Sequence, residues 1–372
     1  MILYELMKNT FLKIYFFFLV FYLAVSLGRG FLPVWFLQNG LSYQLIVLYF
    51  LLKLALPSLI ILLPQKFSTR KSLSWALVSE ILLMLSVYHF FYPWQIYLVA
   101  FFSGTTVVYF YLVYNSLFFE NSPKDKKAFS ASLYLFAGAL LGIVVPLIAG
   151  LISQKFGFTG LFSASIAILL ICFLMIKSLP QISFDSNLYL LLRKHRPVVV
   201  PLLVEGIRDA ISLAVIPTFT LLYIKKPLPY GVYLSYIACV SAVASLFLGF
   251  LSDKYKKRTI FLYSSAIITS FIIILFGLVS DLNTWSIVTG LYTFIATINA
   301  SFVITLVLDK IPDIKESMIL REFLLGAGRT IGSLIYLAPL VLGFSPTKAF
   351  VVIGLIYLCL PLIVYRQKLY QQ

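Results

Sequence analysis

Long apolar runs dominate this chain from end to end. Of its 372 residues, 61% are hydrophobic and only 11% are charged, and the mean hydropathy is +1.01. A water-soluble domain has no core large enough to bury so much apolar surface. Runs of about 20 apolar residues, the length that crosses a bilayer as a helix, recur between short charged or Pro- and Gly-containing breaks. Because lipid forces backbone groups to pair within each segment, the sequence predicts an all-α polytopic membrane protein.

Twelve such runs define the expected transmembrane helices. They cover residues 11–33, 41–63, 71–92, 94–118, 128–152, 157–177, 198–223, 228–250, 259–280, 284–308, 318–342 and 347–365. The longest polar interruption divides them six and six. We therefore expect an N-terminal six-helix half at 1–177, a cytoplasmic central loop at 178–197 and a C-terminal six-helix half at 198–372. The first run is too long for a secretory signal and lacks a small-residue cleavage site, so we expect a retained helix.

Basic residues lie mainly on one side of this arrangement. With the N-terminus inside, twenty Lys and Arg residues fall in segments expected on the cytoplasmic side, and four fall outside. This bias follows the positive-inside rule. It predicts a multi-pass protein of the cell membrane, surrounded by membrane lipid, with both termini in the cytoplasm. The same rule accounts for the net charge of +16 without a nucleic-acid partner.

A loop motif occurs after the eighth run, where residues 249–258 read GFLSDKYKKR. It resembles the signature loop of the major facilitator superfamily, a pattern of Gly, Leu, a small residue, Asp and basic residues. The matching positions are Gly249, Leu251, Ser252, Asp253, Lys254, Lys257 and Arg258. Lys256 replaces the second Gly of the family pattern. After the second run, residues 61–71 repeat the spacing with Gln65 in place of the Asp, as a duplicated half would leave.

The resemblance implies the 6+6 helix bundle of that superfamily and transport by alternating access. It also implies a cytoplasmic gating loop formed by Gly249, Asp253, Lys254, Lys257 and Arg258. For the basic residues, a simple topology signal is an equally good interpretation. Two Gly-rich stretches, 138–150 in the fifth run and 328–343 in the eleventh, carry Gly residues four apart. This spacing allows close helix packing in lipid, and a hinge between transport states is the alternative.

Charged residues interrupt the seventh run. Glu205, Arg208, Asp209 and Ser212 fall at positions i, i+3, i+4 and i+7, so they form one stripe along a helix. A rise of about 1.5 Å per residue places Arg208 and Asp209 near the middle of a hydrocarbon core of about 30 Å. An uncompensated charge at this depth costs about 2.5–3.5 kcal/mol. The stripe must therefore face protein or water.

Further charges lie deep in other runs, and we expect them to form internal ion pairs with Lys53 and Glu80 as the first candidate pair. In the family that the chain resembles, helices 1, 4, 7 and 10 line the transport cavity. Polar residues of the fourth and tenth runs are therefore also expected to line it. The expected substrate and proton cavity comprises Arg29, Lys53, Glu80, Asn115, Glu205, Arg208, Asp209, Asn299 and Arg329.

Two interpretations of the stripe remain open. In the structural one, Glu205 and Asp209 neutralise Arg208 and fix helix packing. In the functional one, which we favour, Arg208 and Arg329 line an aqueous cavity near the midplane, and Asp209 or Glu205 exchanges a proton. The two bases suggest an anionic substrate, but the neighbouring acids would equally receive a cationic one. The sequence does not choose between them.

Nothing in the sequence points to an enzyme, a metal site or a cofactor. His89 and His195 lie near opposite membrane faces, and the chain has no Walker-type phosphate loop. The three cysteines lack ligand-like spacing. We therefore expect a monomeric secondary transporter of a small organic solute, coupled to protons as a symporter or an antiporter. A transport-inactive sensor or assembly partner of the same architecture, and a lipid-moving protein, are the alternatives.

Overall fold

The computed structural model describes residues 10–122, 127–254 and 258–367, and for some of these positions it describes the backbone alone. Nearly all of these residues are helical, as the apolar runs predict. The elements are α2 (Thr10–Gly28), η1 (Arg29–Phe31), α3 (Leu32–Gln38), α4 (Tyr43–Leu62), β1 (Lys66–Ser68), α5 (Thr69–Tyr88), α6 (Gln95–Glu120), α7 (Lys127–Met175), η3 (Ile176–Ser178), β2 (Ser183–Asp185), α8 (Leu188–Lys194), α9 (Arg196–Ala210), η4 (Ile211–Val215), α10 (Ile216–Phe219), η5 (Thr220–Leu222), α11 (Pro227–Lys254), α12 (Arg258–Leu275), η6 (Phe276–Leu278), α13 (Leu282–Lys310), α14 (Ile314–Val341), α15 (Thr347–Leu358) and α16 (Leu360–Arg366).

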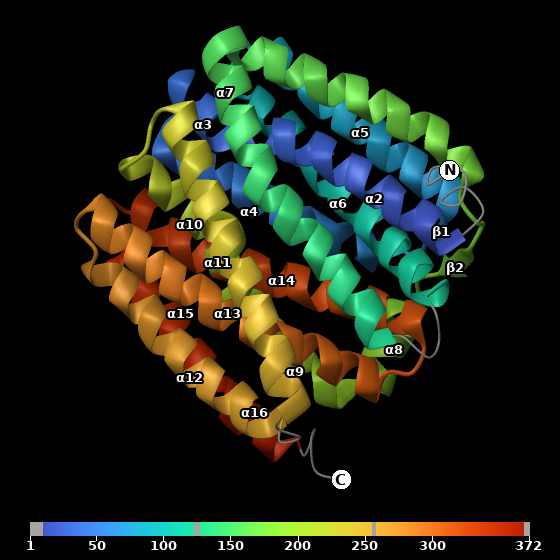
Figure 1. Ribbon diagram of the computed structural model, residues 1–372. Coiled ribbons are helices and arrows are strands. Elements are labelled where there is room, and N and C mark those ends of the chain that lie inside the picture. Colours follow the sequence, from blue (N-terminus) through green and yellow to red (C-terminus); the bar gives the residue numbers. More distant parts are fainter. Residues whose placement is uncertain (1–9, 123–126, 255–257, 368–372) are drawn as a thin grey trace.

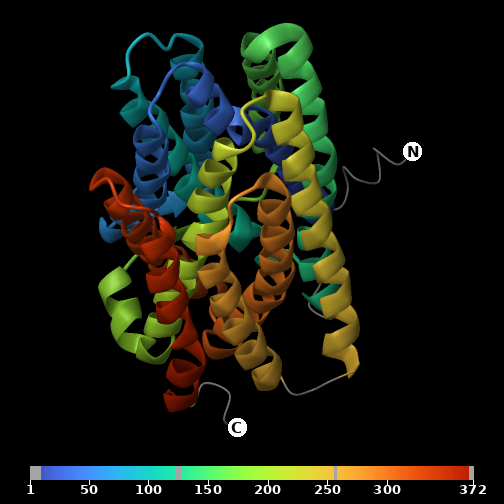
Figure 2. The same ribbon diagram turned by 90° about the vertical axis from the view of Figure 1, so that its left-hand side faces the viewer.

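The helices form one bundle in which long helices run roughly parallel to one another (Figure 2). In Figure 1, helices α2 and α5 to α7 gather on one side and α12, α15 and α16 on the other. The two most extensive helix contacts between the two parts of the chain are those of α4 with α14 and of α7 with α11. On the first of these, the Ser58 hydroxyl donates to the carbonyl oxygen of Phe323 at 2.8 Å. The space between these contacts holds the deep charges.

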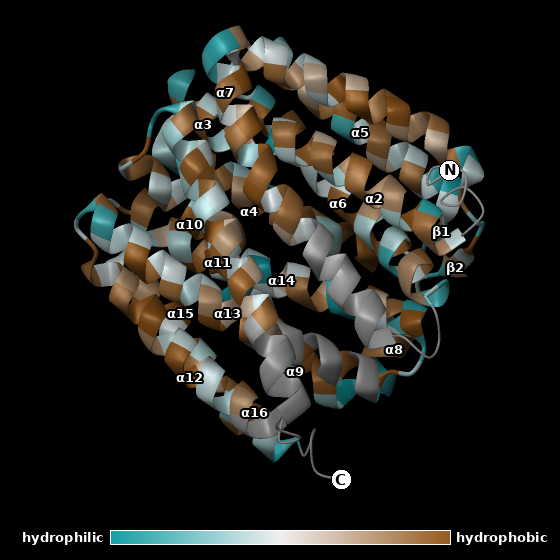
Figure 3. Ribbon diagram, in the orientation of Figure 1, coloured by the Kyte–Doolittle hydropathy of each residue, from teal (hydrophilic) through white to brown (hydrophobic). Residues whose placement is uncertain are grey.

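Nine helical segments of the described chain are long and apolar enough to cross a membrane. Apolar residues cover most of their length, and hydrophilic residues gather mainly near the loops (Figure 3). All twelve apolar runs expected from the sequence overlap helices of the structure. Two of them fall within α7, which turns at Gly157, where φ is +69°. Only glycine adopts this conformation readily, so the backbone at Gly157 ends one helical arm and begins the next.

The segment between the two parts of the chain is more ordered than a loop. Strands β1 and β2 pair in antiparallel fashion, with Lys66 opposite Asp185 and Phe67 opposite Phe184. The Phe67 and Phe184 rings stack with centroids 5.6 Å apart. This small sheet was not predicted from the sequence, because three-residue strands of mixed polarity have too little periodicity to be recognised.

Helices α9 and α14 approach each other unusually closely, and glycines make this approach possible. A Cβ atom built on Gly206 would lie 2.5 Å from the carbonyl oxygen of Leu325. A Cβ atom on Gly332 would lie 2.5 Å from the carbonyl oxygen of Ile207. Both distances are shorter than any normal contact, so a larger residue would force the helices apart. The packing role expected for the glycines of the eleventh run is confirmed, and it brings the charges of α9 next to those of α14.

Candidate functional site

Four helices and one helical break carry the deep charges of the described chain. Helix α9 holds Glu205, Arg208 and Asp209, helix α14 holds Arg321, Glu322 and Arg329, helix α4 holds Lys53, helix α5 holds Glu80, and the break η1 holds Arg29. Immediately after the α9 stripe the chain forms one π-helical turn, η4. Such turns occur often at functional sites, because they rotate the side chains that follow relative to the helix before them.

Arg29 and Glu80 form the first buried pair. The Arg29 Nε atom donates to Glu80 Oε1 at 3.2 Å, and a second guanidinium nitrogen binds Oε2. The Glu80 side chain is fully buried, and 8% of the Arg29 side chain is exposed. The expected pairing of Lys53 with Glu80 was wrong. Similar depth in two helices does not decide which side chains meet, because helix rotation and axial offset are set by packing.

Glu205 and Arg208 form the second pair within α9, with each side chain only 4% exposed. The Tyr357 hydroxyl of α15 lies 2.8 Å from Glu205 Oε2 and 2.5 Å from Asn299 Oδ1. The Asn299 amide in turn donates to the Ser265 hydroxyl at 2.8 Å. The Glu205 carboxylate thus has two partners, Arg208 on one oxygen and Tyr357 on the other. A carboxylate bonded through both oxygens is held in a fixed position.

A chain of four charges links α9 to α14. Arg329 Nε donates to Asp209 Oδ2 at 2.7 Å, and Arg329 also lies 3.9 Å from Glu322 Oε2. Arg321 Nη1 donates to the other Glu322 oxygen at 2.6 Å. The Asp209 side chain is 20% exposed, against 4% for Glu205. Asp209 is therefore the acid of the stripe that water reaches more readily.

Lys53 differs from these residues. No carboxylate lies within 4.0 Å of its ammonium group in the part of the chain that the structure describes. Its Nζ atom lies 5.8 Å from the centroid of the Tyr49 ring and 5.2 Å from that of Phe50. Such cation–π contacts contribute about 0.5–2 kcal/mol, but they supply no counter-charge.

Two adjoining cavities lie between the helices that carry these charges. The first, of about 540 Å³, is lined by Arg208 and Asp209 and is called here the aspartate lobe. The second, of about 560 Å³, is lined by Lys53 and Arg29 and is called the lysine lobe. They share lining residues, namely Tyr22, Ser26, Gly30, Ser212, Leu213 and Leu234. The lobes therefore form one central cavity, of a size that fits small-molecule sites.

The two lobes differ in charge. The aspartate lobe has one base and one acid in its described lining, Arg208 and Asp209. The lysine lobe has four bases and one acid, which are Arg29, Lys53, Arg321, Arg329 and Glu322. Glu80, the partner of Arg29, is fully buried behind the lining. With the partners of its arginines counted, namely Glu80, Asp209 and Glu322, the lysine lobe keeps one base in excess, Lys53.

Most of the expected cavity residues meet here. Arg29, Lys53, Asn115, Arg208, Asp209 and Arg329 line one lobe or the other. Glu205 borders a much smaller space of about 50 Å³ beside Arg321. Asn299 lies in the buried layer behind the cavity, bonded to Tyr357. Tyr357 was not predicted, since a tyrosine in an apolar run carries no signal of its own. Arg321 and Glu322 line the lysine lobe as well, although they were not among the expected cavity residues.

Four of the five expected gating-loop residues, Gly249, Asp253, Lys254 and Arg258, lie within the described residues, but for them the structure describes the backbone only. Asp253 and Lys254 end α11. Lys257 is outside the described residues, and Arg258 begins α12. A different ion pair joins the two parts of the chain at the end of α6 and the start of α14, where Lys315 Nζ lies 3.0 Å from Glu120 Oε1.

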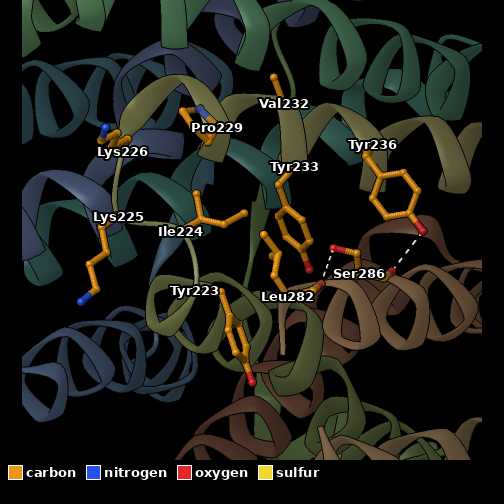
Figure 4. Close-up of a pocket in the computed structure, with 10 residues that line it drawn as sticks. All are labelled: Tyr223, Ile224, Lys225, Lys226, Pro229, Val232, Tyr233, Tyr236, Leu282 and Ser286. Atoms are coloured by element: carbon orange, nitrogen blue, oxygen red, sulfur yellow. Dashed lines mark hydrogen bonds between the residues drawn. The ribbon is translucent and has the colours of Figure 1, made fainter. Parts of the chain in front are cut away.

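A separate cavity of about 770 Å³ lies between η5 and the starts of α11 and α13. Figure 4 shows Tyr223, Tyr233 and Tyr236 around it, with Lys225 and Lys226 on the connecting loop. The Tyr236 hydroxyl donates to the carbonyl oxygen of Ser286 at 3.0 Å. Lysines and tyrosines are typical of a membrane interface. Among the described residues, the lining of this cavity includes none of the paired deep charges that line the central one.

The sequence model of the Major Facilitator Superfamily matches residues 12–335, which include all the described residues that line the central cavity. The chain belongs to this superfamily. This superfamily member is accordingly a multi-pass membrane transporter, and the resemblance based on the loop at 249–258 is confirmed. No curated protein sequence matches the chain.

The fold of this superfamily member is similar to that of a solved transporter. A crystal structure of a mutant of the nucleoside transporter NupG matches with a TM-score of 0.69, covering 96% of this chain and 100% of that one. The two sequences are 12% identical. At this identity the likeness establishes the shared fold, and the solute of the superfamily member must be inferred from its own cavity.

Proposed function

We propose that the chain is a secondary active transporter that moves a small organic solute across the cell membrane by alternating access, driven by protons. In this proposal twelve helices form two six-helix halves, residues 1–177 and 198–372, joined by the central segment 178–197. Both termini face the cytoplasm, and the monomer contains the complete transport path. The charge distribution of the loops supports this orientation.

The observation that carries the proposal is the charged cavity between the two halves. Its lysine lobe is lined by Arg29 and Lys53 from the first half and by Arg321 and Arg329 from the second. Deep charges are costly in lipid and are retained where they bind solutes or ions. A cavity whose walls belong to two halves changes shape when the halves move, and this coupling is what alternating access requires.

Contacts between the halves at both membrane boundaries support two closed ends that open in turn. At one end, Lys315 and Glu120 form their ion pair. At the other, the Phe31 and Tyr230 rings pack edge to face with centroids 5.9 Å apart. The ion pair is weak enough to break in a conformational change, because an exposed ion pair stabilises by about 0.2–1 kcal/mol.

Asp209 is the proposed proton carrier. It lines the aspartate lobe, is partly exposed and holds Arg329 through a 2.7 Å bond. Protonation of its carboxylate would release Arg329, and this release links a proton to a change in the contact between α9 and α14. Glu205 suits this role less well, since it is nearly buried and bonded to both Arg208 and Tyr357.

Reconstituted liposomes provide the test. The purified protein is placed in liposomes that contain a pH-sensitive dye, and a panel of organic solutes is added outside. A solute that changes the internal pH is identified as a substrate. The Asp209→Asn variant should lose proton-driven accumulation and keep exchange of solute at equal concentrations. Asp185→Asn, in the exposed strand β2, serves as the matched control and should behave like the wild type. Accumulation by Asp209→Asn at the wild-type rate would refute the role of Asp209.

The same liposomes separate the alternatives. A sensor or assembly partner would show no flux with any solute. A lipid-moving protein would transfer a fluorescent lipid between leaflets without moving a water-soluble solute. Either result would refute the transport proposal.

A further inference from the structure

The deep charges of the described chain do not balance. Five bases and four acids lie at depth, and four ion pairs use all four acids, namely Arg29 with Glu80, Arg208 with Glu205, Arg329 with Asp209 and Arg321 with Glu322. Lys53 is the base that remains. A cation in the membrane requires a counter-charge or water, and the cavity that Lys53 lines has room for either.

From this we infer that the central cavity binds an organic anion, and that Lys53 contacts its carboxylate or phosphate group. The inference rests on the proposed transport function, and it answers the question of substrate charge that the sequence left open. Arg208 and Arg329, the bases that suggested an anion from the sequence, are already neutralised by Glu205 and Asp209. The preference for an anion therefore comes from Lys53 and not from them.

The surroundings of Lys53 strengthen this assignment. Of the five charged residues that line the lysine lobe in the described chain, four are bases and one, Glu322, is an acid. Glu322 Oε1 already accepts a 2.6 Å bond from Arg321. The other three bases of the lining are paired with Glu80, Glu322 and Asp209, so the excess positive charge of the lobe is that of Lys53, which attracts an anionic solute and repels a cationic one.

Asn115 adds a second requirement for the ligand. It lies on α6, lines the same lobe and is only 5% exposed. Its Oδ1 atom has no hydrogen-bond partner among the residues that the structure describes. Buried polar atoms are nearly always satisfied, so a hydroxyl or N–H group of the ligand is the partner that fits. The ligand expected from these two residues is a small anion that also carries a hydrogen-bond donor.

Size limits the ligand further. The lysine lobe encloses about 560 Å³, within the range of about 300–1,000 Å³ usual for small-molecule sites. Its lining includes the rings of Tyr22, Phe50, Tyr111 and Tyr230. Hydroxy acids and sugar phosphates combine a single strong anion with donor hydroxyl groups at this size.

The test compares ligands of closely related structure that differ in charge. Thermal shift and calorimetry on the purified full chain, at one pH, measure glucuronate against glucose and glucosamine, and ribose 5-phosphate against ribose, within a wider panel of organic anions. Stabilisation by anions only is the expected result, and the carboxylate and phosphate arms distinguish the two headgroups. If no anion stabilises the protein, or if neutral and cationic counterparts bind as well, the inference is refuted.

Variants locate the site. Lys53→Met should weaken anion binding at least about tenfold, and Lys53→Arg should retain it. Lys348→Met is the matched control, because Lys348 also lies over a ring, that of Phe344 at 4.8 Å. Lys348 is exposed and does not line the central cavity. Unchanged anion affinity in Lys53→Met would overturn the assignment. Should that variant fail to fold, the comparison of charged and neutral ligands on the wild type still decides.

The outcomes also separate this inference from the proposed function. Anion binding that depends on Lys53, without flux in liposomes, would uphold the site and refute transport. Proton-driven flux of a neutral or cationic solute that is insensitive to Lys53→Met would uphold transport and refute the anion site.

Discussion

Arg329 on α14 donates to Asp209 on α9 across a 2.7 Å bond, at the wall of the central cavity. The two residues are 120 positions apart in the chain. They meet because Gly206, Gly328 and Gly332 let the two helix backbones approach closely. A packing feature, which the glycine spacing predicts, thus produces the ion pair that we assign to proton coupling.

The first prediction concerns the strength of this pair. Arg329→Met leaves Asp209 without its strongest partner and should lower stability by about 3 kcal/mol, since removing one member of a largely buried pair strands the other. The double variant with Asp209→Leu should recover part of the loss. Melting temperatures of the purified variants measure both effects. Strict additivity of the two single changes would show that the residues do not interact.

The second prediction concerns the other pair of the cavity wall. Glu80→Gln leaves the guanidinium of Arg29 without a carboxylate in a buried setting and should cost about 3–5 kcal/mol. Arg29→Gln combined with Glu80→Gln should restore folded yield, because both charges are then absent. Size-exclusion profiles and melting temperatures report the result. A single Glu80→Gln variant as stable as the wild type would contradict the pairing.

A third prediction addresses the close contact of α9 with α14. Gly332→Ala places a methyl group against the Ile207 carbonyl oxygen and the Ala210 side chain. Overpacking of this kind costs about 1–3 kcal/mol, so the melting temperature should fall. Gly138→Ala on α7 is the control, because nothing in the described chain lies within 4 Å of its added Cβ atom. Equal effects of the two changes would rule out close packing as the cause.

The fourth prediction concerns the ion pair between Glu120 and Lys315, which joins the two groups of helices. Glu120→Gln should favour opening at this end and increase labelling of a cysteine placed at Thr297 in the aspartate lobe. The increase should be about two- to fivefold, since an exposed pair contributes up to about 1 kcal/mol. The background lacks Cys172, Cys239 and Cys359.

Lys194→Gln provides the control for this labelling experiment. It removes a bond of 2.7 Å to Glu316 between α8 and α14, and this bond does not join α14 to α6. Labelling should stay at the wild-type rate. If both variants raise labelling equally, general loosening of α14 explains the result and the role of Glu120 is lost.

The features that were predictable from the amino-acid order are those that depend on position along a helix. The length of the apolar runs predicted the helices, because a bilayer of fixed thickness requires a fixed number of apolar residues. Helical periodicity placed Glu205, Arg208 and Asp209 on one face, and their depth required burial or water. The glycine spacing indicated close packing in α14, because small side chains are what such packing needs.

The pairing of the charges, in contrast, depends on how the helices pack in three dimensions. Depth alone favoured Lys53 as the partner of Glu80, yet Glu80 binds Arg29 and Lys53 lines the cavity. Asn299 was expected to line the cavity because its side chain is polar, but it lies behind the cavity wall, bonded to Tyr357. The physical reason is that the rotation and axial offset of a helix follow from packing against distant neighbours. The position of a charged residue along an apolar run predicts its depth in the membrane. The packing of the helices determines which residue it pairs with.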